Sequence, residues 1–473
     1  MVLALVLRLM AINQSLWLDE AVQVWASSSF SIRELLVKYM PGDFNPPLYH
    51  ILLHFWVKIF GTSELGVRSL SLVLSLGSIL IFVLLLKQLR VASYELRVLT
   101  LLLVTSPLHI YYSQENRMYM LACFAVLLAV WRFLVFLENP SWKNSLYFGL
   151  SLVIMGFSHF MTLLMIPVFL LWGIRGIRAI RGSKLPRLTR LLRMGVAFGL
   201  LTVAYLVYLP LFLKQLQTGL AVKSQFPVWG KTVGSFTLKS AALLPVKFII
   251  GRISISDKLV YGLIAGALVG IYFLIPLVLL ARCVLAGCGF RFREKFVFSL
   301  VLVPSILGFL ISFWVPVFSY FRFLYLLPLF YILVALGFRS LGKLGKLGIL
   351  GLVGVNLICS GVYLLNPKFH RENWRGMVNW LHQENKSNLP VLILGQVAQP
   401  FKYYDRNQSN LIVVDPGGNR FNVLIHENKI FLISYALPIF DPEDKIRQEL
   451  RMMNYELKRG ESFRGVGVEI WEK

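Results

Sequence analysis

Long apolar runs alternate with short basic loops over the first 365 residues of the chain. A helix that spans a membrane needs roughly 20 mostly apolar residues, and the runs predict about eleven such spans. The predicted spans are 1–13, 67–86, 97–112, 118–137, 145–158, 160–174, 194–213, 259–281, 296–315, 323–338 and 347–365. The first is short for a span, and the pair flanking Ser158-His159 forms either two spans or one bent helix. The pattern predicts a polytopic α-helical membrane protein.

The pattern changes at Asn366-Pro367, where amphipathic segments and short β-branched runs replace the long apolar ones. We expect helices over 372–384 and 442–453, the second capped by Asp441, and strands over 391–394, 411–414, 430–434 and 466–471. Pro416-Gly417-Gly418 is typical of a turn and not of a phosphate-binding loop. The sequence therefore predicts a transmembrane domain over 1–365 and a small α/β domain over 366–473.

Composition and charge narrow the class of protein. The chain is 57% apolar and 15% charged, and its mean hydropathy is +0.68, whereas a soluble domain is about 25% charged. Of the net charge of +25, little belongs to residues 366–473, which hold 15 Lys and Arg against 13 Asp and Glu. The basic residues of the first part lie between apolar runs, so we expect a membrane partner and no nucleic acid.

The basic loops predict the orientation in the membrane. Loops 87–97, 132–143, 174–193, 282–295 and 339–346 together hold 19 Lys and Arg and 3 acidic residues. Cytoplasmic loops carry such an excess. The opposite side then receives the first outer loop 14–66, the loops 113–117, 214–258 and 316–322, and the tail. We therefore expect a multi-pass plasma (inner) membrane protein with its tail extracytoplasmic, although loop 214–258 is itself basic.

Four cysteines lie in or beside apolar runs: Cys123, Cys283, Cys288 and Cys359. Their spacing matches neither a zinc site nor a disulfide framework. We expect them to be small buried hydrophobic residues.

Acidic residues are scarce before residue 366, and the adjacent pair Asp19-Glu20 follows the first predicted span. An ionisable group at the membrane is a functional hypothesis by default, although a helix N-terminus also favours acidic residues through its dipole. Partial burial would leave one of the two carboxylates poised as a base.

A second polar cluster surrounds Pro46-Pro47, in the segment 43–49 (DFNPPLY). The two prolines impose an extended turn before the next apolar run. His50 and His54, four residues apart, share one helical face. Two histidines are a weak metal signal, so the metal stays unknown and a divalent cation stays open.

A third cluster is the short polar segment 111–119 (YYSQENRMY) between two predicted spans. Polar groups in such a segment must be hydrogen-bonded within the protein. Glu115 and Arg117 form either a structural ion pair or a substrate site in which the arginine meets a phosphate. Arg322, among aromatic residues on the same predicted side, is either an interface anchor or a second such cation.

The order of these motifs resembles that of the GT-C glycosyltransferases. Residues 15–21 (SLWLDEA), 45–49 (NPPLY), Phe60-Gly61 followed by Arg68-Ser69, and 111–119 occur in the order found in the family 39-like group. That group includes protein O-mannosyltransferases and the aminoarabinose transferase of lipid A. Residues 373–376 (NWRG) are also similar to its bacterial members.

The resemblance implies a GT-C fold and a reaction. Such enzymes move a sugar, with inversion, from a polyprenyl phosphate carrier to an acceptor hydroxyl of a lipid, glycan or protein. It implies a catalytic set of Asp19 as general base with Glu20 and Glu115, and a donor phosphate site of Arg117, Tyr119 and Arg322. Support in the first loop would come from Asn45, Pro46, Pro47, Tyr49 and His54. Many relatives have His where this chain has Asn45.

Two other classes stay open. A lipid-linked glycan ligase or polymerase is also polytopic, but it more naturally relies on arginine-rich outer loops than on an early Asp-Glu pair. A lipid-linked sugar transporter or flippase tends to have paired halves with interrupted helices, and no such internal symmetry is visible in the sequence.

Overall fold

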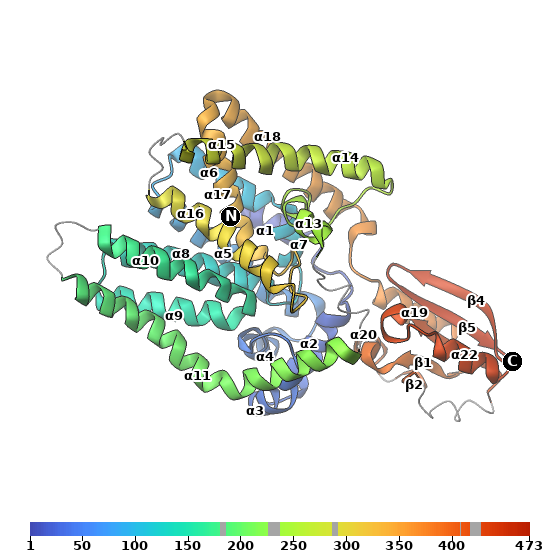
Figure 1. Ribbon diagram of the computed structural model, residues 1–473. Helices are drawn as coiled ribbons and strands as arrows, with labels where there is room; N and C mark the ends of the chain where they lie inside the picture. Colours follow the sequence, from blue (N-terminus) through green and yellow to red (C-terminus); the bar gives the residue numbers. More distant parts are fainter. Residues whose placement is uncertain (180–185, 226–236, 286–291, 407, 417–426) are drawn as a thin grey trace.

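The computed structural model describes residues 1–179, 186–225, 237–285, 292–406, 408–416 and 427–473. Figure 1 shows a large helical body with a small sheet domain beside one end of it. The described buried apolar residues form two clusters, one in the helical body and one within residues 374–471.

Seven helical stretches among the described residues are long and apolar enough to cross a membrane. They are Glu64–Gln88 (α5), Tyr119–Glu138 (α8), Phe160–Arg178, Arg187–Ala221, Lys258–Arg282, Phe292–Ile311 (α16) and Leu324–Leu365. The third comprises a 3-10 turn and α10 (Ile166–Ala179), the fourth lies in α11 (Arg187–Gln225), and the fifth joins α14 (Lys258–Val269) to α15 (Ile275–Leu285). The chain is a multi-pass membrane protein.

The helices differ from the predicted spans at three places. Range 1–13 contains only the eight-residue helix α1 (Val2–Leu9). Range 97–112 divides at Ser106-Pro107 into α6 (Ser93–Thr105) and α7 (Pro107–Ser113), because the residue before a proline is displaced from the helical region. Range 145–158 lies in the 17-residue helix α9 (Trp142–Ser158), which an extended His159 separates from the next element.

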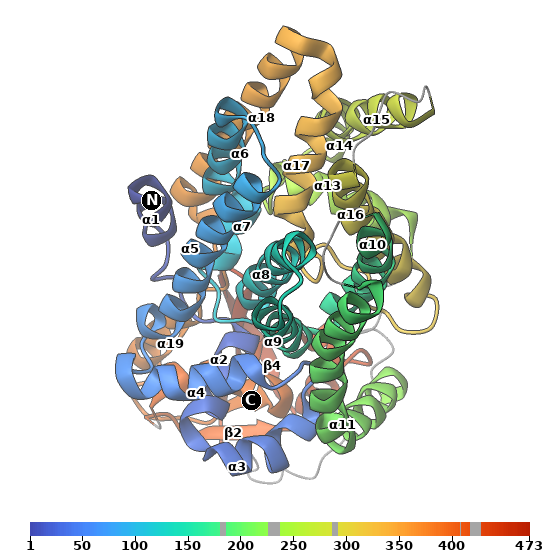
Figure 2. The ribbon, with the colours of Figure 1, turned by 90° about the vertical axis from the view of Figure 1, so that its left-hand side faces the viewer.

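The predicted pair 323–338 and 347–365 lies within one of the seven stretches, Leu324–Leu365. Gly342 has a φ of +54°, a conformation that glycine adopts without strain, and the chain turns back there. The result is two packed helices, α17 (Leu327–Phe338) and α18 (Gly342–Leu365), whose connection stands at the top of Figure 2.

The predicted first loop is itself folded. It forms α2 (Leu18–Ser29), α3 (Ile32–Glu34), two irregular helical turns over Leu35–Tyr39 and Met40–Gly42, and α4 (Leu48–Phe60). Ser31 and Glu34 form a reciprocal capping box at the start of α3. Pro47 stands immediately before α4, and Gly61, with a φ of +74°, ends it. These local signals fold the segment that holds Asp19 and Asp43.

The sheet domain has the strand order β2-β1-β3-β5-β4. Strand β1 (Val391–Leu394) pairs in parallel with β2 (Leu411–Val414) and β3 (Lys429–Ser434), while β5 (Val466–Glu472) pairs antiparallel with β3 and with β4 (Glu456–Phe463). The domain's helices are α19 (Trp374–Glu384), α20 (Ala398–Asp405), α21 (Leu437–Phe440) and α22 (Lys445–Met452).

The four predicted strands are confirmed, but β4 was not predicted because its sequence, ELKRGESF, is largely polar and exposed. The second predicted helix begins later than expected, at Lys445, and the Asp441 carboxylate accepts from the backbone nitrogens of Lys445 at 2.9 Å and Ile446 at 3.0 Å. The N-cap position is held by Asp444, so Asp441 satisfies the first two backbone nitrogens from outside the helix rather than from the N-cap position that the sequence predicted. Gly417 and Gly418 of the predicted turn lie outside the described residues, as do the side chains of Cys283 and Cys288, whereas Cys123 and Cys359 are buried.

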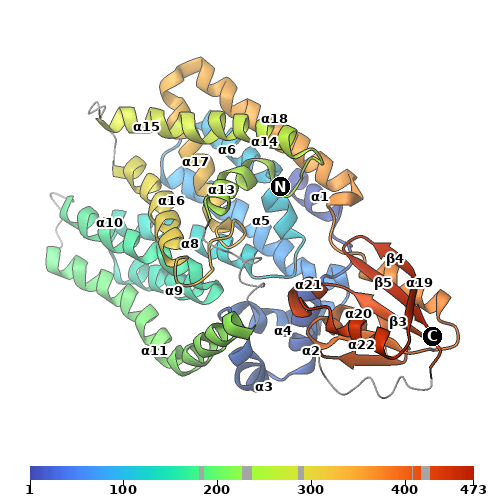
Figure 3. The same cartoon turned by 45° about the vertical axis from the view of Figure 1, so that its right-hand side comes forward.

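The sheet domain is fixed to the start of the helical body. The Tyr404 hydroxyl accepts from the backbone nitrogen of Leu16 at 2.8 Å and donates to Glu64 at 2.8 Å, and Arg375 forms an ion pair with the same Glu64. Leu18, the first residue of α2, packs against the core of the sheet domain. Figure 3 shows α20 beside α2. The segment before Asp19 is thus held by both parts of the chain.

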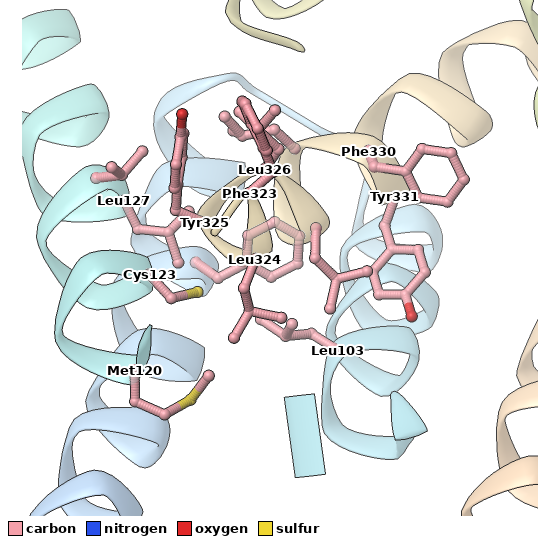
Figure 4. Packing of buried hydrophobic residues seen from close by; sticks show 14 of the residues in the cluster. Leu103, Met120, Cys123, Leu127, Phe323, Leu324, Tyr325, Leu326, Phe330 and Tyr331 are labelled. Carbon is pink, nitrogen blue, oxygen red and sulfur yellow. The ribbon is translucent and has the colours of Figure 1, made fainter. Parts of the chain in front are cut away.

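A buried 3-10 turn over Leu324–Leu326 inserts between helices of the body. Figure 4 shows Phe323 and Leu324 packed between Cys123 of α8 and Leu103 of α6. The Tyr325 hydroxyl donates to the carbonyl oxygen of Met161 at 2.8 Å. This packing fixes the position of Arg322, immediately before the turn.

We expect Ile393→Ala, in the centre of the sheet core, to lower the free energy of unfolding of the domain by roughly 2–5 kcal/mol, because it leaves a cavity at a fully buried position. Leu457→Ala, at an exposed position of β4, is the matched control and should change it little. Limited proteolysis of the detergent-purified protein against temperature measures both. Equal losses in the two variants would contradict the assignment of Ile393 to the core.

Candidate active site

A buried ion pair between Glu20 and Arg68 lies at the centre of the site. Arg68 donates from Nε to Glu20 Oε1 at 2.8 Å and from Nη2 to Glu20 Oε2 at 2.5 Å. Its other donors reach the carbonyl oxygens of Ile12, Gln14 and Ser15 at 2.5–3.0 Å. Both side chains are fully buried. One guanidinium therefore fixes the carboxylate at the start of α2 to the chain segment that leads into it.

A second arginine comes from the linker between α18 and α19. Arg371 donates from Nη2 to Glu115 Oε2 at 2.9 Å, its Nε lies 3.7 Å from Glu20 Oε2, and its guanidinium stacks 4.4 Å from the centre of the Tyr111 ring. Arg371 and Glu115 are both buried. Two carboxylates from the helical body and two arginines thus form one compact cluster, which balances its charge.

The surroundings move the pKa values of the two carboxylates in opposite directions. Burial raises the pKa of Glu20, but the charge and hydrogen bonds of Arg68, the charge of Arg371 and the N–H of Asn116 outweigh it, so the net pKa is lowered. Burial and the negative charge of Glu20 leave the pKa of Glu115 raised, although Arg371 opposes the shift. The two arginines thus favour the charged form of Glu20 more strongly than that of Glu115.

Asn116 links this cluster to the first loop. Its backbone nitrogen donates to Glu20 Oε1 at 2.7 Å, and its side-chain oxygen accepts from the Tyr49 hydroxyl at 2.9 Å. Tyr49 also lies 3.0 Å from the Ser71 hydroxyl. The side-chain nitrogen of Gln23 donates to the Asn116 carbonyl oxygen at 2.7 Å, and the side-chain oxygen of Gln23 accepts from Arg117 Nη1 at 3.0 Å. The same contacts that bury Glu20 therefore also orient Arg117.

Asp19 and Arg117 form the accessible part of the site. Their closest atoms, Asp19 Oδ2 and Arg117 Nη2, are 3.4 Å apart. The Asp19 side chain is 39% exposed, whereas that of Arg117 is 12% exposed. Burial disfavours the charge of Arg117, but Asp19, Tyr119 and Asp43 together raise its pKa. Asp19 is thus a carboxylate that a second molecule can reach, held beside a fixed cation.

Asp43 and His50 also lie near enough to Arg117 to interact with its charge. The Asp43 carboxylate accepts from the backbone nitrogen of Asn45 at 2.8 Å and from its side chain at 3.0 Å. His50 Nε2 is 3.4 Å from Asp43 Oδ2, and Tyr39 donates to the same oxygen at 3.3 Å. Burial lowers the pKa of His50, so the imidazole is neutral at neutral pH.

Arg322 reaches the site from the loop before α17. Its Nη1 donates to the carbonyl oxygen of Pro316 at 2.7 Å, and no carboxylate lies within ion-pair distance of it in the described part of the chain. Burial lowers the pKa of Arg322, and the positive charge of Arg117 lowers it further, whereas Tyr119 raises it. The Tyr119 ring packs against Tyr112 at 5.0 Å and Phe321 at 5.6 Å. Two arginines and a tyrosine therefore converge beside Asp19.

The structure brings together Asp19, Glu20, Glu115, Arg117, Tyr119 and Arg322, the predicted catalytic and phosphate-binding residues. Only some of the predicted support residues in the first loop contact the site. Tyr49 contacts the site through Asn116, and Asn45 through Asp43, while Pro46 and Pro47 precede α4. His54 lies apart: its Nδ1 is 2.9 Å from the carbonyl oxygen of Ser27, and it joins α4 to α2.

Four residues of the site were not predicted as such: Gln23, Asp43, His50 and Arg371. Arg68 was part of a family motif, Phe60-Gly61 followed by Arg68-Ser69, and had no predicted role in the site. The signal for Arg68 was its position as a lone cation inside an apolar run, where a charge needs a partner. Arg371 gave no such signal, because it stands in an ordinary polar segment and reaches Glu115 only through the folding of the linker.

The side chains of the site show whether it could bind the divalent cation that the sequence left open. The described residues contain no group of three or more His, Cys, Asp and Glu side chains that could hold a metal ion. Asp19 and Asp43 are both near Arg117, whose positive charge opposes a cation there. The described residues of the site therefore do not fit a metal, and no step below depends on one.

Comparison with known proteins finds similarity at the level of structure. No protein-family model and no curated protein matches the chain. The chain is similar to ArnT from Cupriavidus metallidurans in the apo state, with 12% sequence identity and a TM-score of 0.55, over 99% of this chain and 96% of ArnT. It is also similar to the oligosaccharyltransferase AglB from Archaeoglobus fulgidus in complex with an inhibitory peptide and a dolichol-phosphate, with 13% identity, a TM-score of 0.54, and coverage of 99% and 73%.

ArnT and AglB both have the GT-C fold, and this chain shares that fold over almost its whole length. The fold that the motifs predicted is therefore confirmed: a multi-pass helical body of the GT-C type with a small C-terminal sheet domain. At sequence identities this low, the similarity establishes the arrangement of the helices and not the reaction.

We expect Arg68→Gln to lower the free energy of unfolding by roughly 3–5 kcal/mol, because it leaves the Glu20 charge buried without its main partner. Glu20→Gln combined with Arg68→Gln should recover part of that loss, since neither charge is then unpaired. Lys38→Gln, in the exposed Lys38–Glu34 pair, is the control and should cost about 1 kcal/mol or less. Thermal unfolding in detergent measures all three, and a double variant no more stable than Arg68→Gln would show that the two charges do not depend on each other.

Proposed function

We propose that this chain is a membrane glycosyltransferase that moves a sugar from a polyprenyl phosphate carrier to an acceptor hydroxyl. The observation that carries the proposal is the convergence of an accessible carboxylate, Asp19, with two arginines, Arg117 and Arg322, next to the membrane-spanning helices. A transfer reaction of this kind needs both a base for the incoming hydroxyl and positive charge for the departing phosphate.

Arg322 supports an anionic donor. Two nearby guanidinium groups repel each other. Arg117 is paired with Asp19, whereas Arg322 donates to a carbonyl oxygen. A phosphate between them would remove the repulsion and satisfy the free donors, because a guanidinium matches phosphate oxygens in shape and charge. The adjacent rings of Tyr119 and Phe321 supply an apolar wall toward the carrier's chain.

The chemical step uses few groups. An Asp19 carboxylate oxygen takes the proton of the acceptor hydroxyl while the acceptor oxygen forms a bond to the anomeric carbon. The bond from that carbon to the phosphate oxygen breaks, and its electron pair leaves with the polyprenyl phosphate, toward Arg117 and Arg322. Attack opposite the leaving group inverts the configuration. The oxocarbenium-like transition state of such displacements gains from the nearby carboxylate.

Glu20 and Glu115 take a positioning role in this proposal. Both carboxylates are buried and engaged by Arg68 and Arg371, so a substrate hydroxyl has no route to them. Their contribution is to hold Asn116 and the start of α2, and through these Arg117 and Asp19. The same reasoning gives Asp43 and His50 the task of shaping the first loop around Arg117.

The similarity to ArnT and AglB supports this class of reaction, because the AglB structure contains a dolichol-phosphate, which is a polyprenol-type phosphate, and an inhibitory peptide. We place the site and the sheet domain on the extracytoplasmic side of the plasma (inner) membrane, because the loops on the opposite side carry the excess of Lys and Arg that cytoplasmic loops have. The acceptor hydroxyl belongs to a lipid, a glycan or a protein.

We expect Asp19→Asn to reduce sugar transfer from a labelled polyprenyl phosphate sugar by roughly 10²–10⁴-fold, the usual contribution of a general base. A panel of carriers in proteoliposomes identifies the sugar and measures the rate. Glu34→Gln, in the same loop but in an exposed ion pair with Lys38, is the control and should leave the rate unchanged. Turnover that survives Asp19→Asn would remove Asp19 from the mechanism, and the absence of turnover with every carrier would favour a transporter.

Arg322→Gln should weaken the use of the donor by about tenfold or more in kcat/KM, the effect of losing one charge-assisted hydrogen bond of about 1.5–3 kcal/mol. The affinity for the acceptor should not change. Arg339→Gln, near Glu95 and Glu294, is the control. Kinetics at varied donor concentration test the assignment, and a defect in the acceptor KM alone would contradict it.

A further inference from the structure

A polar pocket that Asp19 does not line includes Gln14 and Ser15 of the segment that Arg68 fixes. It has a volume of about 310 Å³ and is open to the outside. Its walls come from the segment after α1 (Met10, Asn13), from the linker and start of α19 (His370, Arg375), and from the turn between β4 and β5 (Arg464). The pocket therefore stands where the helical body, the linker and the sheet domain meet.

The pocket is positively charged at its mouth. Arg464 donates from Nε to the carbonyl oxygen of Arg371 at 2.6 Å, and no carboxylate lies within ion-pair distance of it among the described residues. Arg375 is paired with Glu64 yet remains 39% exposed. The turn is held in place, since the backbone nitrogen of Asn373 donates to the carbonyl oxygen of Arg464 at 2.8 Å. A fixed guanidinium with unused donors is suited to an anionic oxygen group.

Apolar surface adjoins the charged mouth. Helix α1 exposes Val2, Leu5, Val6 and Leu9, and Met10, which lines the pocket, is itself exposed. The last turns of α18 expose Ile358 and Leu365. Figures 2 and 3 place α1 near the end of α18, and Gln14 beside the pocket contacts Tyr363 of α18 at 3.1 Å. Hydrophobic surface on two helix ends thus lies next to a cationic pocket.

We propose that this pocket binds the headgroup of an anionic membrane phospholipid, whose acyl chains lie along α1 and the end of α18. A volume of about 310 Å³ lies at the small end of the range for ligand pockets, roughly 300–1,000 Å³, and is room for a phosphate and its glycerol. A free phosphate would use Arg464 but not the exposed apolar surface, so the lipid accounts for both features. The pocket is separate from the proposed donor site, since the segment 12–16 stands between them.

The bound headgroup would contact all three parts of the chain that meet at the pocket. It would therefore stabilise the docking of the sheet domain on the helical body, in addition to the direct bonds of Tyr404 and Arg375. The attraction between one basic residue near the membrane surface and anionic headgroups raises the affinity about fivefold.

The test uses the full chain in nanodiscs of phosphatidylcholine with or without phosphatidylglycerol. Native mass spectrometry counts retained lipid after transfer to detergent, and thermal unfolding is followed in both nanodiscs. The variants are Arg464→Gln, Arg464→Lys and the control Arg459→Gln, an exposed arginine on β4 that pairs with Glu461. Arg464→Lys keeps the charge and shows whether a loss in Arg464→Gln reflects charge or misfolding.

We expect the native chain to retain phosphatidylglycerol over phosphatidylcholine and to unfold at a higher temperature in its presence. Arg464→Gln should reduce phosphatidylglycerol affinity about fivefold, while Arg464→Lys and Arg459→Gln retain most of it. Equal retention by Arg464→Gln and the native chain would overturn the proposal, as would a native chain without lipid preference. Displacement of the lipid by millimolar inorganic phosphate would assign the pocket to free phosphate.

Discussion

The buried pair of Glu20 and Arg68 determines the geometry of the rest of the site. A charge without water must be neutralised and hydrogen-bonded, or its burial costs several kcal/mol. Arg68 meets that requirement for Glu20 and at the same time binds three carbonyl oxygens of the segment before α2. The position of Asp19 follows directly, because it is the neighbour of Glu20 on the first turn of the same helix. An exposed carboxylate is thus placed by a buried one, and its own side chain stays available.

Much of the fold could be predicted from the sequence. Apolar runs located the membrane helices, and the alternation of β-branched residues located four of the five strands, because these patterns reflect burial on one or both sides. Some of the predicted ranges, such as 1–13, contain only a short helix, since an apolar run records burial equally well in such a helix. The turn at Gly342 and the break at Pro107 set the lengths of the helices that the runs only outlined.

The candidate site was predictable only in part, and for a physical reason. Asp19, Glu115 and Arg117 stand out because charged residues are rare in apolar surroundings. Which carboxylate is buried and which is accessible depends on contacts between residues far apart in the sequence, such as Arg68 with Glu20 and Arg371 with Glu115. Asp19 and Glu20 are adjacent in the sequence, yet Glu20 is buried and Asp19 is accessible. No local sequence pattern distinguishes the two.

The origin of Arg371 has a consequence for the order in which the protein forms. Arg371 belongs to the linker that follows α18, yet its charge balances Glu115, which lies between α7 and α8. During synthesis the earlier helices enter the membrane before the ribosome reaches residue 371. Until then Glu115 has no cation at its side from this linker, and burial favours its protonated form. The site is therefore completed last, when the linker docks and Arg371 reaches Glu20 and Glu115.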